Sequence, residues 1–285
     1  MAVIRRFPVA HRVDLVQAIE ALPPLPAIAL RVIQVAQNPK SSASELALVV
    51  SADPGLSARI LRIANSAAYR RSRPVTSVQE SLVVLGFVQA RNVAVSSAIT
   101  SAFAPDALHA LFRIDMFWRH SIAVAFRASD LAIKSRRLDG PSAFTAGILH
   151  NMGRLAMFYA DPAGLDQAVA ETMRAGNTLE SVEAVLLGYN HAELGGLLAM
   201  KWKLPSEIRD AIARHHHDDL PEISLARVVA EADRYCCAHG LFPGYAIPPA
   251  FDTTIVMEPE YKQLMRQVEE LMVLVSGEAT GIRFV

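Results

Sequence analysis

The sequence predicts an all-α fold, and three observations support this prediction. Apolar residues recur at intervals of three and four along most of the 285 residues, which is the spacing of one helix face. Ser or Asp repeatedly precedes these segments, as expected for an N-cap. Alternating polar and apolar residues, which are typical of strands, are essentially absent. With 52% hydrophobic and 20% charged residues, a large buried core is expected and a disordered chain is excluded.

Two predicted helices open the chain, and each has a recognisable start. The first follows Pro26, a residue suited to a first helical turn. Its predicted inward face consists of Leu25, Ile28, Val32 and Val35. The second begins at Ser42-Ala-Ser-Glu45, which is a capping-box signature ahead of an apolar run.

Three more helices are predicted before residue 104. Asp53 followed by Pro54 is an N-cap with Pro at the first helical position. The inward face of that helix is predicted to consist of Leu56, Ile60, Leu61 and Ala64. The capping pattern recurs at Ser77-Val-Gln-Glu80, and Gly86 is the expected C-cap. A helix over about 88–103 follows.

The second half is also predicted to be helical. A long helix over about 107–134 follows Pro105, and a helix over 142–159 follows Pro141. The remaining predicted helices are shorter and cover 165–175, 179–187, 192–202, 206–216, 224–239 and 259–275. The segment 241–257 is rich in Pro, Gly and β-branched residues and is predicted to be a loop.

Charge divides the chain into two parts although the whole is neutral. Residues 1–141 carry 17 basic and 9 acidic side chains, whereas the remainder carries 11 and 19. Two lobes that separate near Pro105 and Asp106 are consistent with this division, and one of them is suited to an anionic partner. Ordinary variation of surface charge is the alternative explanation.

Several features bear on the compartment. The apolar stretch over 81–104 contains Arg91 and has the pattern of an amphipathic segment rather than a membrane span. No apolar core follows the first arginines, so no secretory signal is predicted. The two cysteines are adjacent, at Cys236 and Cys237, and cannot form a disulfide framework. We expect buried, unreactive thiols and a cytoplasmic protein.

Familiar catalytic motifs are missing from the sequence. It contains no GxGxxG, no Gly-Lys-Ser/Thr, no GxSxG, no CxxC and no HExxH pattern. These absences argue against a Rossmann or P-loop nucleotide site, a nucleophilic hydrolase and a zinc-protease helix.

Histidines on successive predicted helices are the strongest chemical signal, followed by one late aspartate. A helical bundle can build an internal metal site in this way, and imidazoles with a carboxylate suit Fe, Mn, Zn or Ni. The alternative is a hydrogen-bonded network of core histidines without metal. The candidate ligands are His120, His150, His191, His215 and Asp233.

A basic segment in the first half is a second candidate site. Its arginines can grip a phosphate or a carboxylate of a partner, and the alternative is a solvated loop. Asn65 and Ser66 are expected to end the preceding helix. The lack of interleaved aromatic residues argues against DNA binding. The arginines concerned are Arg59, Arg62, Arg70, Arg71 and Arg73.

Several ordered motifs resemble the HDOD family. The first-half motifs are ALPPLPAIALRVIQVAQNP, SADPGLSARILRIANSAAY and SVQESLVVLGF; the second-half motifs are WRHSIAVA, AFTAGILHNMGRLAMF and NHAELGGLLAMKWKLPSEIRDAIARHHH. The resemblance covers about 15–220 and implies a compact, HD-like multi-helix bundle with an N-terminal helical lobe over about 15–105 and an HD-like lobe over about 106–220. Residues 1–14 would then be an extension. Residues 221–285 are expected to add helices packed on the HD-like lobe.

The resemblance also defines a departure. HD enzymes bind metal through a His-Asp doublet, which here reads His150-Asn151. In the related HD-GYP pattern, His120, His191, His215 or His216, and Asp233 match other ligand positions, whereas the Gly-Tyr-Pro motif is missing. Neutral asparagine cannot bridge two metal ions or accept a proton as a base. The resemblance therefore implies no catalytic residue, and a single metal ion fits better than a binuclear centre.

These features together predict a non-catalytic bacterial signalling module. Its expected partners are signalling proteins, with a nucleotide or a cyclic dinucleotide as a candidate ligand and no membrane association. No obligatory cofactor is expected. The alternative is a metal-dependent HD-type phosphohydrolase or phosphodiesterase that uses the histidines.

Overall fold

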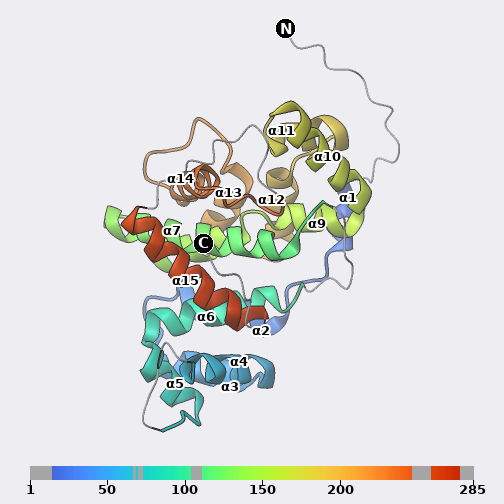
Figure 1. The fold of residues 1–285 in the computed structure, drawn as a ribbon. Coiled ribbons are helices and arrows are strands. Elements are labelled where there is room, and N and C mark those ends of the chain that lie inside the picture. Colours follow the sequence, from blue (N-terminus) through green and yellow to red (C-terminus); the bar gives the residue numbers. More distant parts are fainter. Residues whose placement is uncertain (1–14, 67–68, 70–72, 104–110, 246–257, 277–285) are drawn as a thin grey trace. The chain divides into compact units, whose positions relative to one another are not determined.

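The described part of the chain is entirely helical. The structure, a computed structural model, describes residues 15–66, 69, 73–103, 111–245 and 258–276. These residues form fifteen α-helices and no strand (Figure 1). The predicted all-α fold class is therefore confirmed.

The helices group into two compact units, each built from separate stretches of the chain. Unit 1 draws on residues 1–23, 107–121 and 149–256, and unit 2 on 24–106, 122–148 and 257–285. The long helix α7 (Ile114–Ser135) begins in unit 1 and continues into unit 2. The lobe boundary expected at Pro105 and Asp106 lies outside the described residues, and the sequence-based division into lobes stays a prediction.

Unit 2 contains the helices that lie between residues 24 and 106, together with two later segments of the chain. Besides the later part of α7, it comprises α2 (Ala27–Gln37), α3 (Ala43–Ser51), α4 (Pro54–Ala64), α5 (Val78–Leu85), α6 (Phe87–Thr100), α8 (Gly140–Leu149, up to Ile148) and α15 (Pro259–Ser276). The predicted caps are present: Ser42 forms a full capping box, and Asp53 accepts from the backbone N–H of Leu56 at 2.7 Å. Gly86 has a φ of 77° at the turn between α5 and α6, which glycine adopts without strain.

Unit 1 contains the second group of helices. Besides the start of α7, it comprises α1 (Leu15–Ala21), α9 (Met152–Ala160), α10 (Pro162–Ala175), α11 (Leu179–Leu187), α12 (His191–Lys201), α13 (Ser206–Arg214) and α14 (Leu225–Ala238). Helix α12 packs between α9 and α13, and α13 packs on α14. These four helices supply most of the side chains of the candidate site.

Gly153 explains how α9 and α12 approach so closely. A Cβ at this position would lie against the carbonyl oxygen of His191 and 2.6 Å from the backbone nitrogen of Gly195. Neither is a flexible side-chain end, so any larger residue would push the two helices apart. The glycine therefore holds the start of α12 beside the start of α9.

Three sequence-based expectations are wrong. In α2, Ile28 and Val35, expected to face inward, are half-buried, and the buried face consists of Ala29, Val32, Ile33 and Ala36. The single helix predicted over 142–159 is interrupted after Leu149, and α9 begins only at Met152. Leu61, predicted to be a core residue, is half-buried; the buried face of α4 instead consists of Leu56, Ile60, Ile63 and Ala64. The difference is a rotation of about 100° around the helix, since neighbouring residues are that far apart on its surface.

No single helix among the described residues is long and apolar enough to cross a membrane. Helices α5 and α6 pass the length and hydropathy test only together, and they bend by 117° at their junction. Ten residues of α6 are buried, as in the core helix of a folded unit.

Candidate functional site

The break between α8 and α9 places His150 and Asn151 at the centre of the candidate site. His150 is fully buried, and Asn151 is 2% exposed. Asn151 is the N-cap residue of α9, but its side chain makes no capping hydrogen bond. Its Oδ1 is buried and has no hydrogen-bond partner among the described residues. The side-chain oxygen of an N-cap asparagine usually accepts a hydrogen bond from a backbone N–H of the first helical turn. Because Oδ1 of Asn151 makes no such bond, the side chain does not cap α9.

Five histidines and one aspartate form a single group, hereafter the histidine cluster. Its members come from α7, the α8–α9 break, α12, the end of α13 and α14, and all belong to unit 1. Nε2 of His120 lies 3.3 Å from Nε2 of His150 and 3.0 Å from Oδ1 of Asp233. The other members are linked by Nε2–Nε2 distances of 3.3 Å between His191 and His215 and 3.0 Å between His191 and His216. The rings of His150 and His215 join the two halves, with centroids 5.0 Å apart.

The other nitrogen of three rings is held by an oxygen that can only accept a hydrogen bond. Nδ1 of His120 faces the carbonyl oxygen of Leu241 at 2.7 Å, and Nδ1 of His215 faces that of Ile212 at 2.8 Å. Nδ1 of His191 faces a carboxylate oxygen of Glu183 at 2.5 Å. The two carbonyl oxygens can only accept, so the Nδ1 atoms of His120 and His215 each carry a proton and the Nε2 atoms of these rings face the cluster. Nδ1 of His191 lies between the carboxylate of Glu183 and the guanidinium of Arg154.

The short contacts within the cluster have the spacing that ligand atoms of one shared metal ion would also have. Nε2 of His191 lies 3.3 Å from Nε2 of His215, and Nε2 of His120 lies 3.0 Å from Oδ1 of Asp233. Two ligands on metal bonds of about 2.1 Å lie about 3.0–3.4 Å apart for octahedral to tetrahedral angles, and the contacts fall in this range. Three overlapping sets of ligand atoms lie within 4.8 Å of one another: His191 with His215 and His216, His150 with His215 and Asp233, and His120 with Asp233 and Cys237.

The three histidines around His191 resist protonation. Burial, followed by the charge of neighbouring His216, lowers the pKa of His215 to about 3. Burial, followed by the charge of neighbouring His191, lowers the pKa of His216 to about 3. The pKa of His191 is also held well below its ordinary value, first by burial and then by Arg154. These rings are neutral near pH 7 and are available as ligands.

A buried ion pair supports the cluster from outside. Glu183 is 0% exposed and accepts from Nε of Arg154 at 2.8 Å and from the backbone N–H of His191 at 3.0 Å, in addition to Nδ1 of the same histidine. Arg154 is 2% exposed, and its Nη2 lies 2.8 Å from Nδ1 of His191. Such outer partners fix the tautomer and the orientation of a ligating imidazole.

A cavity of about 400 Å³ lies beside the cluster and is lined by unit 1 residues. His216 and Asp233 of the cluster line it together with Asn151 and Arg154. Phe242 and Tyr245 form part of an apolar wall, with ring centroids 5.4 Å apart. Cavities of this size are suited to small organic ligands.

All five predicted metal ligands belong to the cluster, and the structure adds His216. Whether they hold a metal stays a prediction. Cys236 is buried and Cys237 half-buried. Burial, followed by the charge of Asp233, raises the pKa of the Cys237 thiol well above its ordinary value, in agreement with the expected low reactivity.

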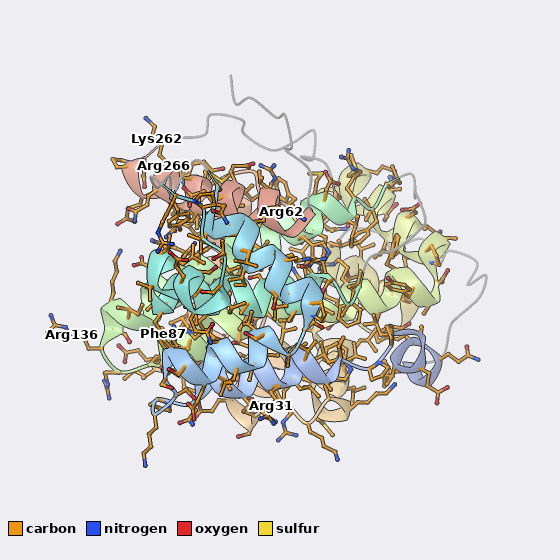
Figure 2. All side chains as sticks on the ribbon, turned by 90° about the horizontal axis from the view of Figure 1, so that it is seen from below. Arg31, Arg62, Phe87, Arg136, Lys262 and Arg266 are labelled. Atoms are coloured by element: carbon orange, nitrogen blue, oxygen red, sulfur yellow. The ribbon has the colours of Figure 1, made fainter. Side chains whose placement is uncertain are left out.

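The predicted basic site is only partly described. Arg70 and Arg71 lie outside the described residues, and Arg73 is paired with Glu80 at 2.9 Å. Arg59 is half-buried and donates to the carbonyl oxygen of Ser97 at 3.2 Å, so it has a structural role. Arg62 is exposed on α4; Figure 2 shows it on the same side as Lys262 and Arg266 of α15, a helix that packs on α4.

Asn65 ends α4 as predicted and also contacts Val75 beyond the arginine loop. Its side-chain nitrogen donates to the carbonyl oxygens of Leu61 and Val75, and its oxygen accepts from the N–H of Val75 at 2.8 Å. Both ends of the arginine loop are therefore tied to one side chain.

Sequence analysis missed three side chains of the site: Arg154, Glu183 and Thr172. The first two had a detectable signal, because each is a charged residue inside an apolar helical pattern. Buried charges are rare unless they are paired, so an Arg and a Glu in such positions predict one another. Thr172 had no such signal.

The sequence profile of the HDOD domain matches residues 22–218. The chain is a member of the HDOD family. A solved HDOD domain protein with unknown function from Geobacter sulfurreducens is 26% identical, with a TM-score of 0.69 over 92% of each chain. A Shewanella amazonensis SB2B protein described as a "putative phosphohydrolase" is 28% identical, with a TM-score of 0.67 over 93% of the HDOD chain and 99% of that protein. The resemblance found in the sequence is thus confirmed.

Curated relatives of this HDOD chain are longer proteins. Ribonuclease Y of Acholeplasma laidlawii (strain PG-8A) is 29% identical over 164 residues, which are 58% of the HDOD chain and 23% of the ribonuclease. The HDOD chain spans 38% or less of the length of the curated relatives it matches. The proteins that this chain is similar to therefore include one described as a "putative phosphohydrolase" and one named ribonuclease Y.

Proposed function

We propose that this HDOD protein is a signal-transduction module that binds one divalent metal ion at the histidine cluster and acts by binding a ligand and partner proteins. Hydrolysis of a phosphodiester is not its main activity in this proposal. The observation that carries the proposal is Asn151, a buried amide at the doublet position whose oxygen lacks a partner among the described residues.

The ligands around Asn151 suit one ion better than two. Imidazole ligands bring no negative charge, and Asp233 is the only carboxylate in the histidine cluster. A bridging carboxylate is what normally holds a second cation close to the first, and an amide cannot replace it. Losing that group should cost several kcal/mol of transition-state stabilisation, or about 10³-fold in rate.

The second candidate is a metal-dependent phosphohydrolase. The intact set of histidine ligands favours it, as does the likeness to the Shewanella protein and to ribonuclease Y. In this reading Asn151 would be a ligand to one ion, and the water would be activated by that ion alone.

Metal analysis combined with a turnover assay separates the candidates. The full chain would be stripped with EDTA, reloaded with Mn, Fe, Zn or Ni, and assayed with cyclic dinucleotides and with bis(p-nitrophenyl) phosphate. We expect one ion per chain and turnover below about 0.1 s⁻¹, whereas typical enzymes reach about 1–10³ s⁻¹. Asn151→Asp should bind metal more tightly, and Asn38→Asp on the exposed end of α2 should match the wild type.

Each part of the proposal has its own refutation. Turnover above about 0.1 s⁻¹ by the loaded wild type would favour the hydrolase. Failure to take up any of the four metals would refute the metal site and leave a hydrogen-bonded histidine network.

The basic surface around Arg62 is the partner surface that we propose. Exposed arginines attract acidic proteins mainly by speeding association, so Arg62→Glu with Arg73→Glu should slow capture of an acidic partner. Added salt should have the same effect. An unchanged association rate at low salt would assign these arginines to solvation alone.

A further inference from the structure

Three buried polar atoms without a partner belong to residues that line the same cavity in unit 1. They are Oδ1 of Asn151, Nη1 of Arg154 and Oγ1 of Thr172, and none has a hydrogen-bond partner among the described residues. The three residues are 2%, 2% and 3% exposed. A buried polar group without a partner costs about 1–3 kcal/mol, and more when it is charged. Three around one cavity point to an absent ligand with complementary polar atoms.

Arg154 shows which kind of ligand fits. The guanidinium donates through Nε to Glu183 and places Nη2 beside His191, so Nη1 is the end left over. A guanidinium only donates hydrogen bonds, and its rigid fork matches the oxygens of a phosphate or a carboxylate. The hydroxyl of Thr172 can donate to the same anion.

The charge of the surroundings favours a phosphate once metal is bound. The acids that line the cavity or bond to Arg154 are Glu180, Glu183 and Asp233, and the bases are Arg154 and Arg234. With neutral histidines this group sums to −1, and a divalent ion changes the sum to +1. An anion is therefore repelled by the metal-free site and attracted to the loaded one.

We infer that the cavity binds a phosphate ester of about mononucleotide size, with its phosphate between Arg154 and Thr172 and its aromatic group against Phe242 and Tyr245. This inference rests on the proposed metal site. The volume of about 400 Å³ lies toward the lower end of the range for ligand pockets. The apolar wall offers two aromatic rings against which a base can pack.

The same arginine links the phosphate to the metal. Arg154 holds Glu183, and Glu183 holds Nδ1 of His191, a member of the histidine cluster. A phosphate that orders Arg154 therefore also favours the ligating orientation of His191. Binding linkage is reciprocal, so phosphate should tighten metal binding by the same factor by which metal tightens phosphate binding.

Calorimetry on the full chain loaded with Mn tests the inference, with 5′-AMP, inorganic phosphate and adenosine as probes. We expect 5′-AMP and phosphate to bind and adenosine to bind at least tenfold more weakly than 5′-AMP. Thr172→Val removes only the hydroxyl at nearly constant shape, and it should weaken 5′-AMP by about 5- to 10-fold, the equivalent of one hydrogen bond. Thr172→Ser should restore binding to within about twofold. Thr145→Val, which alters a buried threonine of unit 2, is the matched control and should leave binding unchanged.

The outcomes separate this inference from the proposed function. Loaded protein that binds adenosine as well as 5′-AMP, or Thr172→Val protein that binds 5′-AMP like the wild type, would overturn the phosphate subsite and leave the metal site intact. Protein that takes up no metal, yet binds 5′-AMP and loses this binding on Thr172→Val, would refute the proposed metal site and its effect on charge, and would support only the contact of Thr172 with the phosphate. Protein that binds neither metal nor phosphate would overturn both.

Discussion

Glu183→Gln is the most informative single substitution in the support of the histidine cluster. The carboxylate accepts three hydrogen bonds: from Nε of Arg154 at 2.8 Å, from N–H of His191 at 3.0 Å and from Nδ1 of His191 at 2.5 Å. Glutamine has nearly the same shape but only one oxygen. Its amide nitrogen must face either the guanidinium or His191, and both present N–H groups. One donor then meets another donor, and Arg154 loses its buried counter-ion.

Two magnitudes follow from this geometry. Breaking a fully buried ion pair by neutralising one partner costs about 3–5 kcal/mol of unfolding free energy. A glutamine that turns its nitrogen to His191 also favours the tautomer whose Nε2 carries the proton, and loss of such an outer partner weakens metal binding about 10- to 100-fold.

Urea unfolding in EDTA measures the first quantity, and competition with a metal-binding dye measures the second. Glu171→Gln is the matched control, because Glu171 pairs with Arg174 on the surface and should affect neither quantity. If Glu183→Gln loses less than about 1 kcal/mol and keeps its metal affinity, the assigned role of Glu183 is wrong.

Three further predictions concern stability. In the metal-free chain, His215 and His216 have a pKa of about 3 when folded and about 6.5 when unfolded, so unfolding takes up protons below pH 6.5. Urea unfolding should show that each ring lowers the free energy of unfolding by about 2 kcal/mol between pH 7 and pH 5. Equal stability at both pH values would contradict this prediction. Ile60→Ala should lower the free energy of unfolding by about 2–5 kcal/mol, and Leu61→Ala by about half of that or less. A larger loss for Leu61→Ala than for Ile60→Ala would show that Leu61 faces the core after all. Gly153→Ala should lower the free energy of unfolding by about 1–3 kcal/mol and weaken metal binding, because the added methyl group displaces α12 at its first residue. Thermal unfolding and metal titration measure the two effects. No change in either would show that α9 and α12 can separate freely.

Local chemistry made the helix boundaries of the first half predictable. The side chains of Ser42, Asp53 and Ser77 each accept from the backbone three residues later, as their sequence patterns indicated. Such caps depend only on neighbouring residues, so they can be detected without tertiary information. Gly86 ends α5 for the same kind of local reason, since its φ of 77° suits glycine.

The break at His150 and Asn151 could not be predicted in this way. No Pro or Gly stands at these two positions, and the apolar pattern continues from α8 into α9. What interrupts the helix is tertiary: His150 faces His120 and His215, and Gly153 packs on the backbone of α12. Leu61 shows the same limit, because an apolar pattern of moderate width leaves open which of two neighbouring residues faces the core.

The loss of one carboxylate at position 151 changes the charge of the site as well as its ability to activate water. A divalent ion held by neutral imidazoles and by Asp233 keeps a net charge near +1, whereas a second carboxylate at position 151 would neutralise it. An uncompensated positive charge beside a cavity attracts an anion. Asn151→Asp should therefore strengthen metal binding and weaken 5′-AMP binding at the same time. Titration of the Mn-loaded variant tests this: tighter binding of both metal and 5′-AMP would show that charge balance does not govern the site.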